Sequence, residues 1–188
     1  MAKLYFRYGA MGSAKTANLL MTSFNFEEKG FKVLLIKPSI DDRFSVGYIE
    51  SRIGIKRKCF LLEKNQSILK TLNLNGDNTI VFIDEVQFLS EKQVNELVYI
   101  VDNLNINVFC YGLKTDFTGK LFCGSKRLIE VCDNIDEIKS ICECGNKALF
   151  NARIDELGNI ITEGETIKIG SNESYKPLCR KCFIKNLI

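Results

Sequence analysis

The sequence has no histidine among its 188 residues. Without histidine, a protein cannot use a Ser-His-Asp or Cys-His catalytic mechanism, and it cannot bind a metal ion through imidazole. Any acid–base chemistry must therefore use a carboxylate, a lysine, a tyrosine or a cysteine.

The sequence also lacks a continuous run of about 18 apolar residues, which a membrane-spanning helix requires. Residues 1–10 carry Lys3 and Arg7 but not the apolar stretch of a signal peptide. We therefore predict a cytoplasmic protein that has no membrane partner. In that reducing compartment, the eight cysteines are expected to be free thiols or metal ligands rather than disulfides.

Strong charge of one sign is absent as well, because the formal net charge is only +3 and no dense run of Lys and Arg occurs. This argues against a nucleic-acid partner, but it suits a pocket for a small anion such as a nucleotide. The chain has an ordinary globular balance of 46% hydrophobic and 26% charged residues. That balance allows one sizeable core, with or without a small appendage.

Apolar runs and helical repeats alternate along most of the chain. The strands expected after the first helix are apolar almost throughout, which is typical of a parallel sheet covered on both faces. The predicted fold class is therefore α/β with a parallel sheet, although residues 39–78 show no clear pattern. Strands are expected at residues 3–8, 31–37, 79–84 and 106–111, and helices at residues 15–29 and 91–104.

The pattern changes near residue 140, where cysteines cluster and glycines separate short β-prone runs. No internal repeat or low-complexity tract interrupts the chain on either side. We therefore predict an α/β core at residues 1–139 and a small second domain at residues 140–188.

Residues 9–16, GAMGSAKT, lie between an expected strand and an expected helix. The phosphate-binding P-loop has Gly, four residues, Gly, Lys and then Ser or Thr, and only Ala14 departs from that pattern. In such a loop, backbone N–H groups hold phosphate oxygens, the lysine reaches the β- and γ-phosphates, and the hydroxyl helps to hold Mg²⁺. The alternative is a Gly- and Ala-rich turn before a helix. The predicted ATP-binding residues here are Gly9, Ala10, Met11, Gly12, Ser13, Ala14, Lys15 and Thr16.

A pair of acidic residues, Asp84 and Glu85, follows the apolar run IVFI. A buried strand that ends in a carboxylate places it at the carboxyl edge of the sheet, where ligands bind in such folds. Asp84 then suits a contact to Mg²⁺, and Glu85 is the leading candidate for a general base because no histidine exists. Since neighbouring strand residues alternate sides, the two side chains are expected to diverge. The alternative is a charge pair that only faces solvent.

Four cysteines form two close pairs late in the chain, Cys142 with Cys144 and Cys179 with Cys182. Two such pairs brought together make a tetrahedral four-thiolate site, the usual arrangement for structural zinc, with no position open for catalysis. The alternative is a set of unconnected thiols, which is how we interpret the remaining single cysteines.

These features together resemble the type II thymidine kinases, the cytosolic group that includes animal and many bacterial enzymes. The resemblance covers essentially the whole chain, and bacterial members begin much like residues 1–11, MAKLYFRYGAM. Further similar segments occur in the family order: DDRF (41–44), DEVQFL (84–89), CYGLKTDF (110–117), IGSNESY (169–175) and CRKC (179–182).

The resemblance implies a P-loop (RecA-like) core and a C-terminal lasso domain anchored by zinc. It implies transfer of the ATP γ-phosphoryl group to the 5′-hydroxyl of thymidine, which gives dTMP in pyrimidine salvage, with deoxyuridine as an expected second substrate. A homotetramer that dTTP inhibits is implied as well.

Roles for individual residues also follow from the resemblance. Glu85 would be the general base, and residues 166–170 would belong to a lasso loop that closes over the base. The expected nucleotide-site residues beyond the P-loop are Asp41, Arg43, Asp84 and Gln87. The expected thymidine-binding residues are Phe88, Leu113, Phe117, Thr166, Ile167, Lys168, Ile169, Gly170 and Tyr175.

Two other classes of protein fit parts of the sequence. Asp-Glu after a strand also occurs in P-loop ATPases that act on nucleic acid, although 188 residues leave little room for a second lobe. A zinc-ribbon binding module without catalysis is the other. Nucleic-acid-stimulated ATP hydrolysis without thymidine phosphorylation would favour the ATPase, and strongly salt-dependent binding of DNA or RNA would favour the module.

Overall fold

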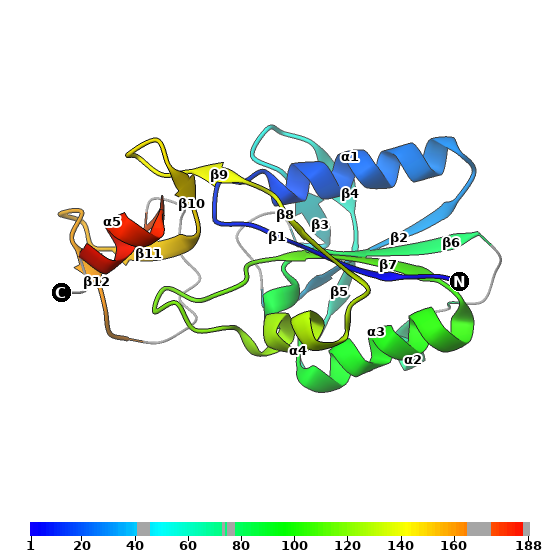
Figure 1. Cartoon of the computed structure of the whole chain (residues 1–188). Coiled ribbons are helices and arrows are strands. Elements are labelled where there is room, and N and C mark those ends of the chain that lie inside the picture. Colours follow the sequence, from blue (N-terminus) through cyan, green and yellow to red (C-terminus); the bar gives the residue numbers. More distant parts are fainter. Residues whose placement is uncertain (41–45, 73, 75–77, 165–173, 186–188) are drawn as a thin grey trace.

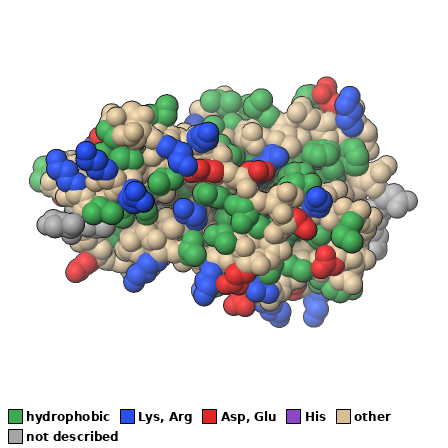
Figure 2. All heavy atoms as spheres, viewed as in Figure 1, with side chains coloured by type: hydrophobic (Ala, Val, Ile, Leu, Met, Phe, Trp, Pro, Cys, Tyr) green, Lys and Arg blue, Asp and Glu red, His purple; other side chains and the backbone are tan. Residues whose placement is uncertain are grey.

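The computed structural model describes residues 1–40, 46–72, 74, 78–164 and 174–185. A twisted sheet crosses the molecule with helices on both faces, and small antiparallel strands lie at one end (Figure 1). Among these residues, no helix has both the length and the apolar character that a membrane span needs. Acidic and basic side chains are interspersed over the face in Figure 2, as expected from the small net charge.

The central sheet has six parallel strands in the order β5-β2-β6-β7-β1-β8. This confirms the predicted α/β class, and the four strands expected from the sequence form the middle of the sheet. Every residue of β6 is buried, which explains its uninterrupted apolar run. The strands are β1 (Leu4–Tyr8), β2 (Lys32–Pro38), β5 (Phe60–Leu62), β6 (Thr79–Ile83), β7 (Asn107–Gly112) and β8 (Asn134–Glu137).

Helices cover both faces of the sheet and bury a separate apolar cluster on each (Figure 1). On one face, α1 packs over the rings of Phe82, Phe109 and Tyr111. Phe82 and Phe109 stack with their ring centroids 4.8 Å apart. The larger cluster on the other face joins three further helices to the sheet. The helices are α1 (Lys15–Glu28) on the first face and α2 (Ile68–Thr71), α3 (Glu91–Leu104) and α4 (Cys123–Val131) on the second.

The two predicted helices form as α1 and α3. The sequence predicts one apolar side for α1, formed by Leu19, Leu20, Ser23, Phe24 and Phe26, but the buried side is narrower. Leu19, Leu20 and Ser23 are buried, whereas Phe24 is 52% exposed. Phe24 therefore belongs to the outer surface of the helix rather than to the core.

Residues 39–78, which showed no pattern, include a small hairpin beside α1. Its strands are β3 (Tyr48–Glu50) and β4 (Lys56–Lys58), which pair antiparallel. Arg57 of β4 donates two hydrogen bonds to the carboxylate of Glu27 on α1. That pair connects the hairpin to the helix whose N-terminus carries the Gly-rich loop.

Antiparallel strands begin at Ser140, directly after the parallel sheet ends with β8. One pair is β9 (Ser140–Ile141) with β10 (Lys147–Ala148), and β11 (Phe150–Ile154) pairs with both β12 (Ile160–Ile161) and β13 (Tyr175–Leu178). The helix α5 (Arg180–Lys185) completes this C-terminal part. The division into domains at 1–139 and 140–188 remains a prediction from the sequence.

Candidate active site and metal centre

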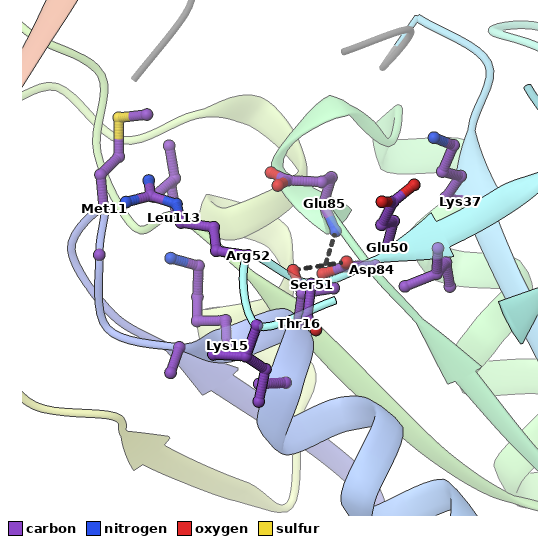
Figure 3. Close-up of a pocket in the computed structure, with 15 residues that line it drawn as sticks. Met11, Lys15, Thr16, Lys37, Glu50, Ser51, Arg52, Asp84, Glu85 and Leu113 are labelled. Atoms are coloured by element: carbon purple, nitrogen blue, oxygen red, sulfur yellow. Dashed lines mark hydrogen bonds between the residues drawn. The ribbon is translucent and has the colours of Figure 1, made fainter. Parts of the chain in front are cut away.

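A cavity of about 270 Å³ lies where the carboxyl ends of β2 and β6 meet the N-terminus of α1 (Figure 3). Its walls come from the Gly-rich loop, from residues 49–53 at the end of β3, and from Asp84, Glu85 and Leu113. A polar pocket at the carboxyl edge of a parallel sheet is where such folds bind ligands. The structure thus brings the predicted loop and the predicted acidic pair into one site.

The Gly-rich loop ends with Ala14 in a left-handed backbone conformation, with φ 59° and ψ 29°. Ala14 is the N-cap of α1, and no side chain caps the helix there. The first N–H groups of α1 therefore face the cavity without a local side-chain acceptor at the cap. Such a helix end attracts anions, because its N–H groups and its dipole both present positive charge.

Lys15 lies inside the curve of this loop and is only 8% exposed. Its ammonium donates hydrogen bonds to the carbonyl oxygens of Gly9, at 3.1 Å, and Ala10, at 3.0 Å. The positive charge is thereby held beside the N-terminus of α1, on the wall of the cavity (Figure 3).

Asp84 follows β6 and is 4% exposed. Its Oδ2 accepts a hydrogen bond of 2.9 Å from the Thr16 hydroxyl, and its Oδ1 accepts one of 3.1 Å from the Glu85 N–H. Burial, and next the charge of Glu85, raises the pKa of Asp84 to about 7, against the effect of the Thr16 hydrogen bond. The Thr16 hydroxyl oxygen and Asp84 Oδ2 therefore lie side by side. A nearby cation would favour the charged form of the Asp84 carboxyl, which burial and Glu85 disfavour.

Glu85 also lines the cavity, but not for the reason expected from strand alternation. β6 ends at Ile83, and Glu85 has a left-handed backbone with φ 53°. This turn, and not the pleat of a strand, separates the directions of the two carboxylates. A left-handed conformation is costly for a residue with a side chain, and such strain is concentrated at functional sites.

Gln87 supports this arrangement and does not line the cavity. It lies in the short 3₁₀ helix η1 (Val86–Phe88) and is buried. Its amide nitrogen donates to the Glu85 carboxylate, and its amide oxygen accepts from the Leu113 N–H at 3.0 Å. Gln87 therefore connects Glu85 to the loop after β7, and its place in the nucleotide site stays a prediction.

The predicted aromatic residues of the thymidine site, Phe88, Phe117 and Tyr175, each contact another side chain of the described structure. Phe88 meets Phe122 edge to face, with ring centroids 6.2 Å apart. Phe117 is buried beneath Arg153, whose guanidinium also binds the hydroxyl of Tyr175. Asp41, Arg43, Thr166, Ile167, Lys168, Ile169 and Gly170 lie outside the described residues.

Sequence reasoning missed several residues of the site. Ser51, Arg52 and Ile53 follow β3 and line the cavity, but no periodicity marked them. Lys37 is buried on the cavity wall near the end of β2, and a lysine that closes an apolar run could have indicated it. Arg153 had no local signal at all.

The four predicted metal ligands meet in the C-terminal part. The Sγ atoms of Cys142, Cys144, Cys179 and Cys182 all lie within 4.8 Å of one another. Cys144 Sγ lies 3.5 Å from that of Cys142 and 3.6 Å from that of Cys179. Tetrahedral zinc with Zn–S bonds of about 2.3 Å requires S···S distances of about 3.8 Å, so the cluster has the size that zinc needs.

The surroundings of Cys144 favour its thiolate form, whereas hydrogen bonds to Cys144 and Cys179 raise the pKa of Cys182 to about 12. A backbone N–H of Asn146, followed by its side-chain amide, lowers the pKa of Cys144 to about 6. Thiolate is the form that binds a metal. The four cysteines could therefore hold a zinc ion.

The fold and the cavity define a class, namely a parallel α/β protein with a helix N-terminus, a lysine and two carboxylates at one pocket, as in nucleotide-using phosphotransferases. A family model described as thymidine kinase matches residues 2–183. This chain therefore belongs to the thymidine kinase family.

Curated relatives agree with this assignment. The chain is 44% identical over 186 residues to a thymidine kinase of Shewanella oneidensis, and the match covers 97% of each chain. It is also 44% identical over 190 residues to that of Zymomonas mobilis, covering 100% of this chain and 98% of the relative. A thymidine kinase of Haemophilus influenzae is 45% identical over 183 residues, covering 96% and 95%. These relatives indicate a nucleoside kinase.

Proposed function

We propose that this chain is an ATP-dependent thymidine kinase, which transfers the γ-phosphoryl group of ATP to the 5′-hydroxyl of thymidine. The observation that carries the proposal is the cavity, where Lys15, Thr16, Asp84 and Glu85 meet at the N-terminus of α1. Thymidine kinases that match nearly the full length of this chain support the choice of substrate.

The loop at residues 9–16 would bind the ATP phosphates. Its helix N-terminus and the ammonium of Lys15 present positive charge to the cavity. Thr16 Oγ1 and Asp84 Oδ2, which lie 2.9 Å apart, are suited to hold Mg²⁺, directly or through water. When bound, Mg²⁺ would neutralise negative charge on the transferring phosphoryl group.

Glu85 would accept the proton of the attacking 5′-hydroxyl. It lies at the cavity, and the amide of Gln87 holds its carboxylate. Gln87 also binds the Leu113 N–H, so the general base and a residue of the proposed nucleoside pocket share one support. Phe88, Phe117, Phe122 and Tyr175 would complete that pocket together with the predicted lasso residues.

Zinc would have a structural role, because all four positions of a tetrahedral site would be filled by cysteine. Two of these cysteines, Cys142 and Cys179, belong to the small apolar cluster of the C-terminal part. The metal would thus hold together a region whose own core is small.

A cytoplasmic homotetramer that dTTP inhibits is part of the same proposal. The outer side of α1 exposes Met21 and Phe24, an apolar surface that a neighbouring subunit would cover. Light scattering after size-exclusion chromatography measures the number of subunits. Steady-state inhibition by dTTP tests the feedback effect.

The deciding experiment supplies ATP with each of the four common deoxynucleosides and with deoxyuridine, and measures nucleoside monophosphate. Thymidine should be the best substrate, and Lys15→Met should lower turnover about 10²-fold or more, because it removes a charge that contacts the phosphates. Lys92→Met, which changes an exposed lysine on α3, is the control. ATP hydrolysis stimulated by DNA or RNA, without any nucleoside phosphorylation, would contradict the proposal.

A further inference from the structure

Arg153 is a buried cation in the C-terminal part of the chain. It lies on β11 and is only 4% exposed. A buried guanidinium is costly unless its charge and its donors are satisfied, so its contacts indicate why it is there.

Two of those contacts are with aromatic residues from different parts of the sequence. The guanidinium carbon lies 3.9 Å from the centre of the Phe117 ring, a close cation–π arrangement. Nε and Nη2 both donate to the hydroxyl oxygen of Tyr175, at 3.0 Å and 2.8 Å. The Arg153 guanidinium therefore stacks on the Phe117 ring and also binds the Tyr175 hydroxyl.

The position of Arg153 in the strands makes this contact possible. β11 and β13 pair antiparallel with Arg153 opposite Tyr175. Phe117 belongs to the loop after β7, beyond Leu113 on the cavity wall. A Cβ built on Gly164 would lie 3.7 Å from Nη1 of Arg153, so the guanidinium also approaches the last described residue before the predicted lasso.

A second contact of β11 reaches the phosphate side of the site. Asn151, two residues before Arg153 and on the same face of the strand, accepts a hydrogen bond of 2.7 Å from the Met11 N–H. One face of β11 therefore contacts both the Gly-rich loop and the proposed nucleoside residues.

We propose that Arg153 is a positioning residue for the nucleoside. It holds the Phe117 ring and the Tyr175 hydroxyl in the arrangement that accepts the base, and it does so through stacking and a two-donor fork that a flexible ammonium does not reproduce. The inference rests on the proposed thymidine kinase function.

The test compares steady-state constants of Arg153→Met, Arg153→Lys and Tyr175→Phe with those of the unchanged chain. Arg153→Met should raise the KM for thymidine by about tenfold or more, while the KM for ATP changes less than about twofold. Arg153→Lys should recover only part of the loss, because it keeps charge over the ring but loses the fork. The control is Lys176→Met on the same strand as Tyr175, where Lys176 pairs with Glu143 at the surface.

A double-mutant cycle separates positioning from general destabilisation. Arg153→Met should cost much less in a Tyr175→Phe background than alone, because the two residues share one interaction. Thermal melting and zinc content identify variants that fold. If Arg153→Met does not fold, Arg153→Lys and Tyr175→Phe give the answer.

Three outcomes would overturn the inference: an unchanged KM for thymidine in the folded variants, equal rises in the KM for thymidine and ATP, or fully additive effects in the cycle. The proposed function fails separately, if the unchanged chain does not phosphorylate thymidine at all. That result would remove both, whereas an active chain with an unaffected Arg153→Met variant would remove only the role of Arg153.

Discussion

At the scale of single residues, the site depends on two left-handed backbone positions that are not glycine. Ala14 ends the Gly-rich loop at φ 59°, and Glu85 begins the acidic turn at φ 53°. Only glycine adopts this region without steric cost, which is about 1–2 kcal/mol for other residues. The surrounding contacts therefore hold both positions against their local preference.

Ala14 offers a direct test of that cost. Ala14→Gly should leave the stability unchanged or raise it by up to about 1 kcal/mol, because relief of strain exceeds or balances the greater freedom of glycine in the unfolded chain. ATP binding should be equal or better. Thermal melting and an ATP titration measure the two effects.

Gly12 provides the converse variant in the same loop. It has φ 76°, and a Cβ there would meet nothing closer than 4.0 Å, so Gly12→Ala adds strain without a clash. That variant should lose about 1 kcal/mol of stability.

One outcome would contradict the prediction for Ala14. Tenfold weaker ATP binding by Ala14→Gly would mean that the loop is built around the alanine methyl group.

Glu85 is the proposed general base, so its removal should slow the chemical step. Glu85→Gln should lower kcat about 10²-fold, the lower end for a general base, because phosphoryl transfer depends largely on positioning and charge. ATP binding should survive, since Glu85 is not part of the Gly-rich loop. Single-turnover rates and an ATP titration measure both quantities. Glu91→Gln, an exposed acid at the start of α3, is the control, and a near-normal kcat for Glu85→Gln would rule out the assignment.

Local sequence identified part of the site and not the rest, for physical reasons. Lys15, Thr16 and Asp84 were predictable because parallel strands bring their carboxyl ends to one edge of the sheet. Arg153 and Phe122 were not predictable, because their contacts depend on the packing of segments far apart in the sequence. The role of Gln87 as a support was also hidden, since it depends on a turn that strand alternation does not describe.

At the scale of elements, the acidic turn is held by a close approach between η1 and α4. A Cβ built on Gly124 of α4 would lie 2.4 Å from the Val86 carbonyl oxygen and 2.8 Å from that of Leu89. Backbone atoms cannot yield as a side chain can, so only glycine allows the two helices to pack this closely.

Gly124→Ala should therefore destabilise the protein by about 1–3 kcal/mol, the usual range for overpacking. It should also lower kcat, because movement of η1 displaces Gln87 and the Glu85 carboxylate that it holds. Urea unfolding and kinetics measure the two effects. Lys126→Ala, at an exposed position on α4, should change stability by less than about 0.5 kcal/mol. A Gly124→Ala variant with the stability and kcat of the unchanged chain would show that the helices can separate freely.

The length of each element decides whether the sequence predicted it. Continuous apolar runs marked the long strands, and helical periodicity marked α3, which begins with the Ser90 and Gln93 capping box. The hairpin of β3 and β4 showed neither pattern, because its strands have three residues each and are stabilised by contacts with α1. The edge strands β5 and β8 were missed as well, because three and four residues are too few to show a pattern.

At the scale of the whole molecule, two parts differ in how they are stabilised. The sheet and its helices bury apolar clusters of 20 and eight residues, whereas the described C-terminal cluster has seven, of which one is Ala10 of the Gly-rich loop and two belong to the group of four cysteines. A core of that size rarely holds a fold by itself, and metal binding commonly supplies the missing free energy. Yet β11 of this part contacts both Met11 and Phe117, so the proposed activity depends on it.

Loss of the metal should therefore abolish activity while the α/β core remains folded. We expect one zinc ion per chain, and Cys179→Ser should release it and make residues 145–178 sensitive to protease. Elemental analysis, limited proteolysis and circular dichroism measure these effects, and Cys123→Ser, at an exposed single cysteine on α4, is the control. Since the free energy of metal binding is also free energy of folding for this part, a chelator should have the same effect as the substitution. A protein without zinc, whose eight cysteines all react freely with a thiol reagent in the native state, would contradict the prediction.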